Sequence, residues 1–394
     1  MAETPRPSAA ATLPEGFTLL QITPELDGGG VEQATLDVAA AVAAAGRKSL
    51  VVSQGGGLEG DLTASGARLV RMPVQSKNPV VLALNALRLG QVIRRERVSV
   101  VHVRSRAPAF SALSAARRAG APLVATYHGA YSADGALKRW YNAVMTRGDM
   151  VIANSLFIRD HVLAEHGLDP GRIALVPEGI DTLRFSPASV SSQRVADVRR
   201  AWGLREREDR TVILLAARLT RLKGQLLLTE ALGRLPDRDG VVLILAGGGG
   251  RPEYRDEIEA AAAVAGLSGQ VRLVGPCDDM PAAYLACDLV AAPSTQPESF
   301  GRTVVEAGAM RRPVLAAAHG GPAETIVDGQ TGWLVAPGDP DAWTAALAKA
   351  LSSTPEERAA MGERAQRRVK RLYSLPAMCE ATFEVYRRML EGRE

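Results

Sequence analysis

Short apolar runs alternate with longer amphipathic stretches along most of the chain. In the first half, the apolar runs are residues 17–22, 49–53, 98–103, 123–127, 150–153 and 173–176. Between them, residues 31–45 and 107–119 are rich in Ala and have helical spacing of their apolar positions. Continuous apolar runs of this length, separated by helices, are typical of parallel strands that are buried on both faces. The pattern predicts a parallel sheet covered by helices.

The alternation pauses between residues 181 and 210 and then restarts. The later apolar runs are residues 211–216, 241–246, 271–273, 289–292 and 314–316, with a helical stretch at 225–235. At 394 residues the chain exceeds one ordinary core, so we expect an α/β protein of two Rossmann-like, doubly wound domains whose strand ends face a crevice. The predicted divisions are a disordered lead-in without signal-peptide pattern (1–14), a first domain (15–185), a linker (186–210), a second domain (211–370) and a C-terminal helix that crosses to the first domain (371–394).

Composition narrows the class of protein. Hydrophobic residues make up 46% and charged residues 23%, as in soluble globular proteins, and no apolar stretch is long enough to span a membrane. The three cysteines have no Cys-x-x-Cys spacing. We therefore expect no disulfide framework, no zinc site and a reducing, cytoplasmic environment.

Basic residues are concentrated in one segment of the first half. The formal net charge is +4, yet between Arg68 and Arg118 eleven Lys and Arg residues accompany one acidic residue, Glu96. This excess is either a set of solvated helix faces or a patch for anionic lipid head groups or an anionic acceptor. Arg94, Arg95 and Arg97 are the candidate patch residues. Few aromatic residues interleave with them, which disfavours nucleic acid as a partner.

Three glycines, Gly28, Gly29 and Gly30, lie between the first apolar run and the first helix. Glycines in such a turn let backbone N–H groups approach a phosphate, and a helix N-terminus favours negative charge. The dinucleotide fingerprint fails, because position 33 is Gln33, and Gly-Lys-Ser/Thr is absent. A tight turn without a ligand is an equal alternative.

Two cations follow the first strand of the second domain. Arg218 and Lys223 lie in a loop between a strand and a helix, at the carboxyl edge of the predicted sheet. A planar guanidinium and a mobile ammonium can together hold a diphosphate. A solvated loop is the alternative.

Two carboxylates, Glu298 and Glu306, flank the start of a helix predicted at residues 303–310. Backbone N–H groups between Gly301 and Thr303 would face an anion there. A carboxylate inside the helix could bind the two hydroxyls of a ribose, and one in the loop could bind sugar hydroxyls. Ordinary surface charge is the alternative.

The order of these features resembles the retaining family-4 glycosyltransferases, which have the two-domain GT-B architecture. Further strings agree with the resemblance, which extends from about Phe17 to Tyr386. They are Thr126-Tyr127-His128-Gly129, Ala153-Asn154-Ser155, Val176-Pro177-Glu178-Gly179-Ile180-Asp181, Gly320-Gly321-Pro322-Ala323-Glu324 and Asp328-Gly329-Gln330-Thr331-Gly332. Two departures stand out: Glu178 replaces a common Asn, and four glycines at 247–250 replace Gly-x-Gly.

The resemblance implies a role for each matching residue. Glu306 would hold the ribose, Arg218 and Lys223 the diphosphate, and Glu298 the hydroxyls of the transferred sugar. Gly29 and Gly30 would close on the diphosphate, and His128 would lie beside the sugar, with His128 and Glu298 as the catalytic pair. The remaining donor contacts would come from the backbone of Phe300, Gly301, Arg302 and Thr303.

The resemblance implies transfer of a sugar from a nucleotide-diphosphate donor, UDP favoured over GDP, with retention of configuration. Fixed cations and a helix N-terminus would stabilise the leaving diphosphate, and no Asp-x-Asp is placed for a metal, so we expect neither metal nor cofactor. The expected acceptor is a glycan or lipid-linked molecule of envelope polysaccharide or lipopolysaccharide assembly, at the inner face of the cytoplasmic membrane. A nucleotide-sugar epimerase and a non-catalytic nucleotide-sugar-binding protein are the alternatives.

Overall fold

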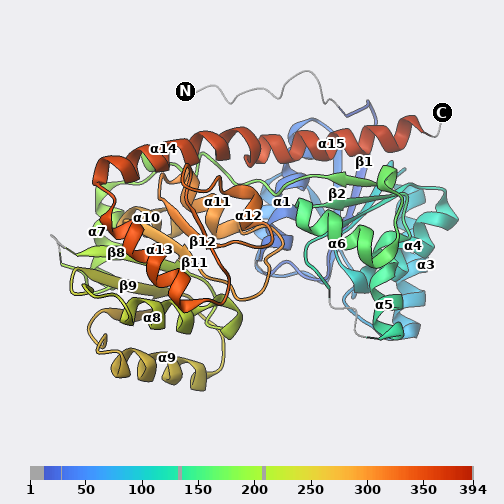
Figure 1. Ribbon diagram of the computed structural model, residues 1–394. Coiled ribbons are helices and arrows are strands. Elements are labelled where there is room, and N and C mark those ends of the chain that lie inside the picture. The colour runs from blue at the N-terminus through green and yellow to red at the C-terminus, as the bar shows by residue number, and fades with distance from the viewer. Residues whose placement is uncertain (1–12, 28, 132–134, 206–209, 393–394) are drawn as a thin grey trace. The chain divides into compact units, whose positions relative to one another are not determined.

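The computed structural model describes residues 13–27, 29–131, 135–205 and 210–392 (Figure 1). The contacts divide the chain into two units. Unit 1 comprises Met1–Gly179 and Leu375–Glu394, and unit 2 comprises Ile180–Ser374. Most of the predicted lead-in and Gly28 of the glycine run lie outside the described residues.

Unit 1 is built on a parallel sheet of seven strands in the order β3-β2-β1-β4-β5-β6-β7. Both faces of this sheet are buried, because Leu20 of β1 belongs to one apolar cluster and its neighbour Leu19 to another. The strands are β1 (Thr18–Ile22), β2 (Lys48–Ser53), β3 (Arg68–Arg71), β4 (Val100–Val103), β5 (Leu123–Tyr127), β6 (Met150–Ala153) and β7 (Ile173–Leu175).

Helices from distant parts of the chain cover the two faces of this sheet. One cluster contains side chains of α3, α4 and α6, and the other contains side chains of α1 and of the C-terminal helix α15. The helices of unit 1 are α1 (Gly30–Ala44), α2 (Glu59–Ala64), α3 (Pro79–Arg95), α4 (Arg106–Ala119), α5 (Ala136–Asn142), α6 (Leu156–His166) and α15 (Leu375–Glu391).

Unit 2 repeats this design with six parallel strands in the order β10-β9-β8-β11-β12-β13. They are β8 (Thr211–Ala216), β9 (Val241–Ala246), β10 (Val271–Gly275), β11 (Leu289–Ala292), β12 (Val314–Ala317) and β13 (Trp333–Val335). The helices are α7 (Ser192–Ala201), α8 (Gln225–Gly233), α9 (Pro252–Val264), α10 (Met280–Ala286), α11 (Arg302–Ala309), α12 (Pro322–Thr325), α13 (Pro340–Ser352) and α14 (Pro355–Leu372).

Successive side chains of β8 again point into two clusters, Val212 and Leu214 into one and Ile213 and Leu215 into the other. This alternation requires helices on both faces of the sheet, as in unit 1. The predicted fold class, two doubly wound parallel α/β domains, is therefore confirmed.

Each sheet has one position where the strand order reverses. In unit 1 the reversal lies between β1 and β4, and in unit 2 it lies between β8 and β11. The loops that leave two such strands run in opposite directions and open a crevice at the carboxyl edge, where ligands of doubly wound sheets bind. Most candidate residues of the sequence follow these strands.

Candidate active site

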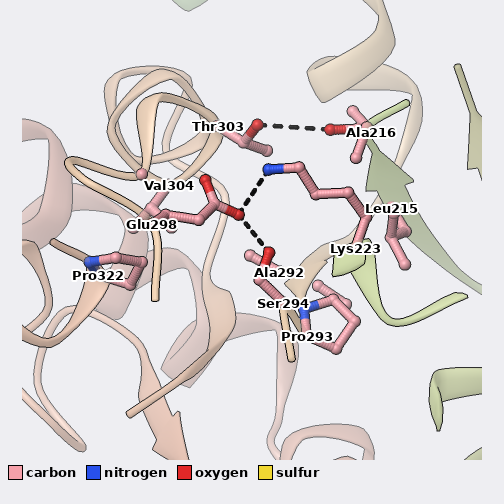
Figure 2. Close-up of a pocket in the computed structure, with 13 residues that line it drawn as sticks. Leu215, Ala216, Lys223, Ala292, Pro293, Ser294, Glu298, Thr303, Val304 and Pro322 are labelled. Atoms are coloured by element: carbon pink, nitrogen blue, oxygen red, sulfur yellow. Dashed lines mark hydrogen bonds and ion pairs between the residues drawn. The ribbon is translucent and has the colours of Figure 1, made fainter. Parts of the chain in front are cut away.

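A pocket of unit 2 lies at the β8/β11 reversal (Figure 2). Its wall is formed by the ends of the two strands, the loops that follow them and the start of α11. Among the predicted residues, Lys223, Glu298, Gly301 and Thr303 line it. The side chain of Arg218 is exposed and is not among the lining residues.

Glu298 is the centre of the hydrogen bonding in this pocket. Lys223 Nζ lies 2.8 Å from Glu298 Oε1, and the Ser294 hydroxyl donates to the same oxygen (Figure 2). Both members of the ion pair are partly exposed, at 26% of each side chain. An ammonium on a flexible stem, held by one carboxylate oxygen, keeps donors that a ligand can use.

Glycines allow the loops around Glu298 to approach one another. A Cβ on Gly320 would lie 2.3 Å from the Glu298 carbonyl oxygen, and a Cβ on Gly321 would lie 2.3 Å from Phe300 Cα. Gly321 N–H donates to the Glu298 carbonyl at 2.8 Å. The string Gly320-Gly321 after β12 therefore holds the backbone of the Glu298 loop in place.

The second carboxylate, Glu306, lies on α11 and is nearly buried, with 12% of its side chain exposed. Arg302 Nε donates to its Oε1 at 2.8 Å, and the Tyr284 hydroxyl donates to its Oε2 at 2.9 Å. Burial first, then the Glu306 charge, holds the pKa of Tyr284 well above its usual range, so the phenol keeps its proton and can donate. Glu306 is thus a carboxylate of fixed orientation one turn inside the helix.

The residues between the two carboxylates have different surroundings. The Phe300 side chain is buried and packs edge-on against Tyr373, so only its backbone remains available to a ligand. The Thr303 hydroxyl donates to the Ala216 carbonyl at the end of β8, 3.4 Å away. Gly301, at φ 83°, precedes α11 and takes a backbone conformation that favours glycine.

Sequence reasoning missed Ser294 and Tyr284 and left His319 as structural. Ser294 is two residues past β11, a position at the strand's carboxyl end that could have marked it. Tyr284 is 22 positions from Glu306, and no local pattern connects the two residues. His319 Nε2 contacts the Ser294 carbonyl at 2.8 Å, which links the loop after β12 to the pocket.

In unit 1 the glycine turn and His128 follow separate strands. Gly29 precedes α1 in extended conformation, and Gly30 is the first residue of the helix with open space around it. His128 follows β5, and only 7% of its side chain is exposed. Its Nδ1 lies 3.3 Å from Glu178 Oε1. The contacts of these residues with a donor remain predictions.

The basic segment separates into buried and exposed members. Arg104 is buried, with 4% of the residue exposed, and Arg68 pairs with Glu96 at 2.6 Å. Arg68 and then Lys48 hold the pKa of Glu96 below its usual range. Arg94, Arg95 and Arg97 are exposed at the C-terminal end of α3 and just beyond it. Among the described residues, no helix has the length and hydrophobicity needed to cross a bilayer.

Two parallel α/β units, each with candidate residues at the carboxyl edge of its sheet, define the GT-B class of fold. Residues 200–368 match the model of Glycosyl transferases group 1, and residues 28–184 match that of Glycosyltransferase Family 4. A glycosyltransferase structure from Rickettsia africae is 30% identical, with a TM-score of 0.88 over 96% of this chain and 99% of that one. The chain belongs to glycosyltransferase family 4.

Other relatives match different shares of the chain. The D-inositol 3-phosphate glycosyltransferase of Salinispora arenicola is 36% identical over 222 residues, which are 54% of this chain and 49% of that protein. The match spans about half the length of such relatives. The HepE protein of Anabaena, solved in complex with UDP, is 24% identical with a TM-score of 0.82 over 94% of this chain and 99% of that one, and it shows the fold alone.

Proposed function

We propose that the protein transfers a sugar, with retention of configuration, from a nucleotide-diphosphate donor to a glycan or lipid-linked acceptor. The observation that carries the proposal is the placement of Lys223 and Glu298 in the pocket at the β8/β11 reversal of unit 2, with Glu306 on α11, the helix whose first turn lines this pocket. A cation for phosphate and two oriented carboxylates for hydroxyl groups form the set that a nucleotide sugar requires. Family membership and the UDP in the HepE structure favour a UDP-sugar as the donor.

The proposed roles follow from the charge and orientation of each group. Glu306, held by Arg302 and Tyr284, accepts hydrogen bonds from the ribose hydroxyls. Lys223, with the exposed Arg218, binds the diphosphate and stabilises the negative charge that develops as the anomeric bond breaks. Glu298 exchanges its contact with Lys223 for hydroxyls of the transferred sugar.

The donor site is tested by thermal unfolding with UDP, GDP and their sugar conjugates, without added metal. A ligand present at 100 times its Kd stabilises the folded state by about 2.7 kcal/mol, so binding raises the Tm visibly. Glu306→Ala and Lys223→Ala should each weaken this stabilisation. Glu230→Ala is the control, because Glu230 also forms an i,i+4 pair with an arginine, Arg234, elsewhere on unit 2.

Each alternative function predicts a different result. If no nucleotide raises the Tm, the donor site is contradicted and a scaffold role is favoured. If a nucleotide sugar binds and is converted to its epimer without any acceptor, the protein is an epimerase. Release of UDP together with transfer of the sugar supports the transferase.

For the acceptor, we propose a molecule at the inner face of the cytoplasmic membrane, with Arg94, Arg95 and Arg97 attracting anionic lipid. The exposed apolar side chains Val80 and Leu84, also on α3, support this proposal, because basic and apolar groups together favour an anionic bilayer surface.

Reversal of the three patch arginines to Glu should abolish sedimentation with phosphatidylglycerol vesicles. The matched control reverses Arg367, Lys370 and Arg371, which are exposed on α14 of unit 2. Equal sedimentation of the two triple variants would contradict the patch.

A further inference from the structure

Four polar side chains follow four adjacent strands of unit 1. Arg104 comes directly after β4, His128 directly after β5 and Asn154 directly after β6, while Glu178 lies three positions beyond β7. These strands are neighbours in the sheet, in the order β4-β5-β6-β7. The four residues therefore line one pocket at the carboxyl edge, together with Met378 and Thr382 of α15.

Glu178 connects two members of this row. Asn154 Nδ2 donates to Glu178 Oε1 at 2.8 Å, and His128 Nδ1 lies 3.3 Å from the same oxygen. An ionised carboxylate only accepts hydrogen bonds, so the proton of the imidazole is held on Nδ1 and the amide is held with its NH₂ group toward Glu178. One carboxylate thus determines the orientation of both side chains.

This arrangement leaves two buried acceptors unused. His128 Nε2 and Asn154 Oδ1 are both buried and have no hydrogen-bond partner among the described residues. Leaving such atoms unpaired costs free energy, which a bound donor group would recover. Arg104 lies in the same pocket, and its hydrogen bonds within the described chain go to the neutral Gln21 Oε1, at 2.9 Å and 2.7 Å.

The available groups match the hydroxyls of a sugar. When the neutral His128 ring carries its proton on Nδ1, its Nε2 accepts a hydrogen bond. Asn154 Oδ1 is also an acceptor, whereas the Arg104 guanidinium only donates. A hydroxyl group can donate to the first two and accept from the third. The positive charge of Arg104 is offset by the negative charge of Glu178, so the pocket favours a neutral hydroxyl-bearing ligand over an anion.

We propose that Glu178 is a positioning residue, which orients His128 and Asn154 so that Nε2 and Oδ1 accept hydrogen bonds from hydroxyls of a sugar substrate. This inference rests on the proposed transferase function and on the predicted role of His128. It gives a function to Glu178, the residue that replaces the Asn common at this position in the family. A neutral Asn side chain at this position would be shorter and would carry no charge.

The test is a mutant cycle on UDP release from UDP-glucose, UDP-galactose and UDP-N-acetylglucosamine. Glu178→Ala should lower kcat by about ten- to a hundredfold, as expected for loss of a hydrogen bond to a charged group. A residue that acts through His128 and Asn154 has no further effect once both side chains are absent. Glu178→Ala should therefore lower kcat no further in a background that carries both His128→Ala and Asn154→Ala. Glu178→Gln, which keeps an acceptor oxygen, should restore part of the loss.

A second measurement follows the orientation itself. Long-range ¹H–¹⁵N NMR of the histidine rings should show His128 as the Nδ1–H tautomer in the wild type and in Glu178→Gln, and a tautomer mixture in Glu178→Ala. Asp149→Asn is the matched control, because Asp149 is a carboxylate just before β6, at the opposite edge of the sheet, where it accepts from Leu123 N–H at 2.8 Å. It should leave kcat and the His128 tautomer unchanged.

The outcomes separate this inference from the proposed function. Wild-type kcat in Glu178→Ala, or a further loss from Glu178→Ala when His128 and Asn154 are both Ala, would overturn the positioning role while leaving the transferase intact. A wild type that binds and cleaves no nucleotide sugar would overturn the proposed function, and the role of Glu178 in it. An unchanged His128 tautomer in a folded Glu178→Ala protein would also overturn the inference.

Discussion

At the scale of single residues, the donor pocket depends on backbone approaches that only glycine permits. Gly321 packs against the backbone of Phe300, and its N–H bonds to the Glu298 carbonyl. These contacts join the loop after β12 to the loop after β11. The position of Glu298 therefore depends on a residue that has no side chain to contribute.

Gly321→Ala should weaken nucleotide-sugar binding and lower the free energy of unfolding by about 1–3 kcal/mol, the usual cost of overpacking. The added Cβ would lie 2.3 Å from backbone atoms of Phe300, which must move and displace Glu298. Thermal unfolding with and without UDP measures both effects. Gly269→Ala is the control, because a Cβ there meets nothing within 4 Å. Equal behaviour of the two variants would contradict this account of the pocket.

At the scale of secondary structure elements, a buried histidine links three segments of unit 1. His102 of β4 contacts the Tyr386 hydroxyl of α15 through Nδ1 at 2.7 Å and the Thr126 hydroxyl of β5 through Nε2 at 2.6 Å. Burial first, then the charge of Arg104, holds the pKa of His102 well below 6.5. The folded state therefore keeps a neutral ring where the unfolded chain binds a proton.

This difference predicts that the unfolding free energy of unit 1 is highest above pH 6.5 and falls as the pH drops toward the lowered pKa of His102. One such histidine changes the unfolding free energy by at most about 1.4 kcal/mol per pH unit. His102→Gln should flatten the slope in denaturant titrations between pH 7 and pH 5. Burial also lowers the pKa of His166, so this residue should add a second contribution. The variant in which both His102 and His166 are replaced by Gln should therefore show the smallest change of unfolding free energy with pH. An unchanged slope in His102→Gln would contradict the assignment.

At the scale of the whole molecule, unit 1 is assembled from both ends of the chain. Leu375–Glu394 groups with unit 1 although all of unit 2 lies between it and the preceding part of unit 1 in the sequence. Phe383, Tyr386 and Met389 of α15 are buried in a cluster with Leu19 of β1 and Val38 of α1. Without α15 the apolar side chains of β1 and α1 that it covers would be exposed to water.

A chain that ends at Ser374 should lose the cooperative unfolding of unit 1, because each exposed large apolar side chain costs about 1.5–3 kcal/mol and domains are stable by only about 5–15 kcal/mol. Unit 2 keeps all its strands and should still be stabilised by UDP. Circular dichroism melts with and without UDP test this. A chain that ends at Glu391 is the control and should unfold like the full chain. If unit 1 still unfolds cooperatively in the chain that ends at Ser374, the prediction is contradicted.

Periodicity along the sequence was sufficient for the central strands and insufficient at the edges of the sheets. The predicted runs at 123–127 and 241–246 coincide with β5 and β9, whose residues are all buried. In contrast, the edge strands β3 and β13 were missed. β3 is half exposed and begins and ends with Arg, and β13 is apolar but only three residues long. The C-terminal helix predicted at residues 371–394 begins only at Leu375, because Tyr373 and Ser374 separate α15 from α14.

The sequence by itself determined which segments become strands and helices, because burial on both faces of a parallel sheet demands continuous apolar runs. It also marked Lys223, Glu298 and Glu306, since each lies in or just beyond a loop that follows a strand. Only the tertiary structure decided that Tyr284 orients Glu306, that Arg104 is buried and that Glu178 meets His128 and Asn154. Tyr284 and Glu306 lie on different helices, where no local pattern connects them. Arg104, His128, Asn154 and Glu178 lie just beyond different strands, and their side chains converge because parallel strands bring all their carboxyl ends to one edge of the sheet.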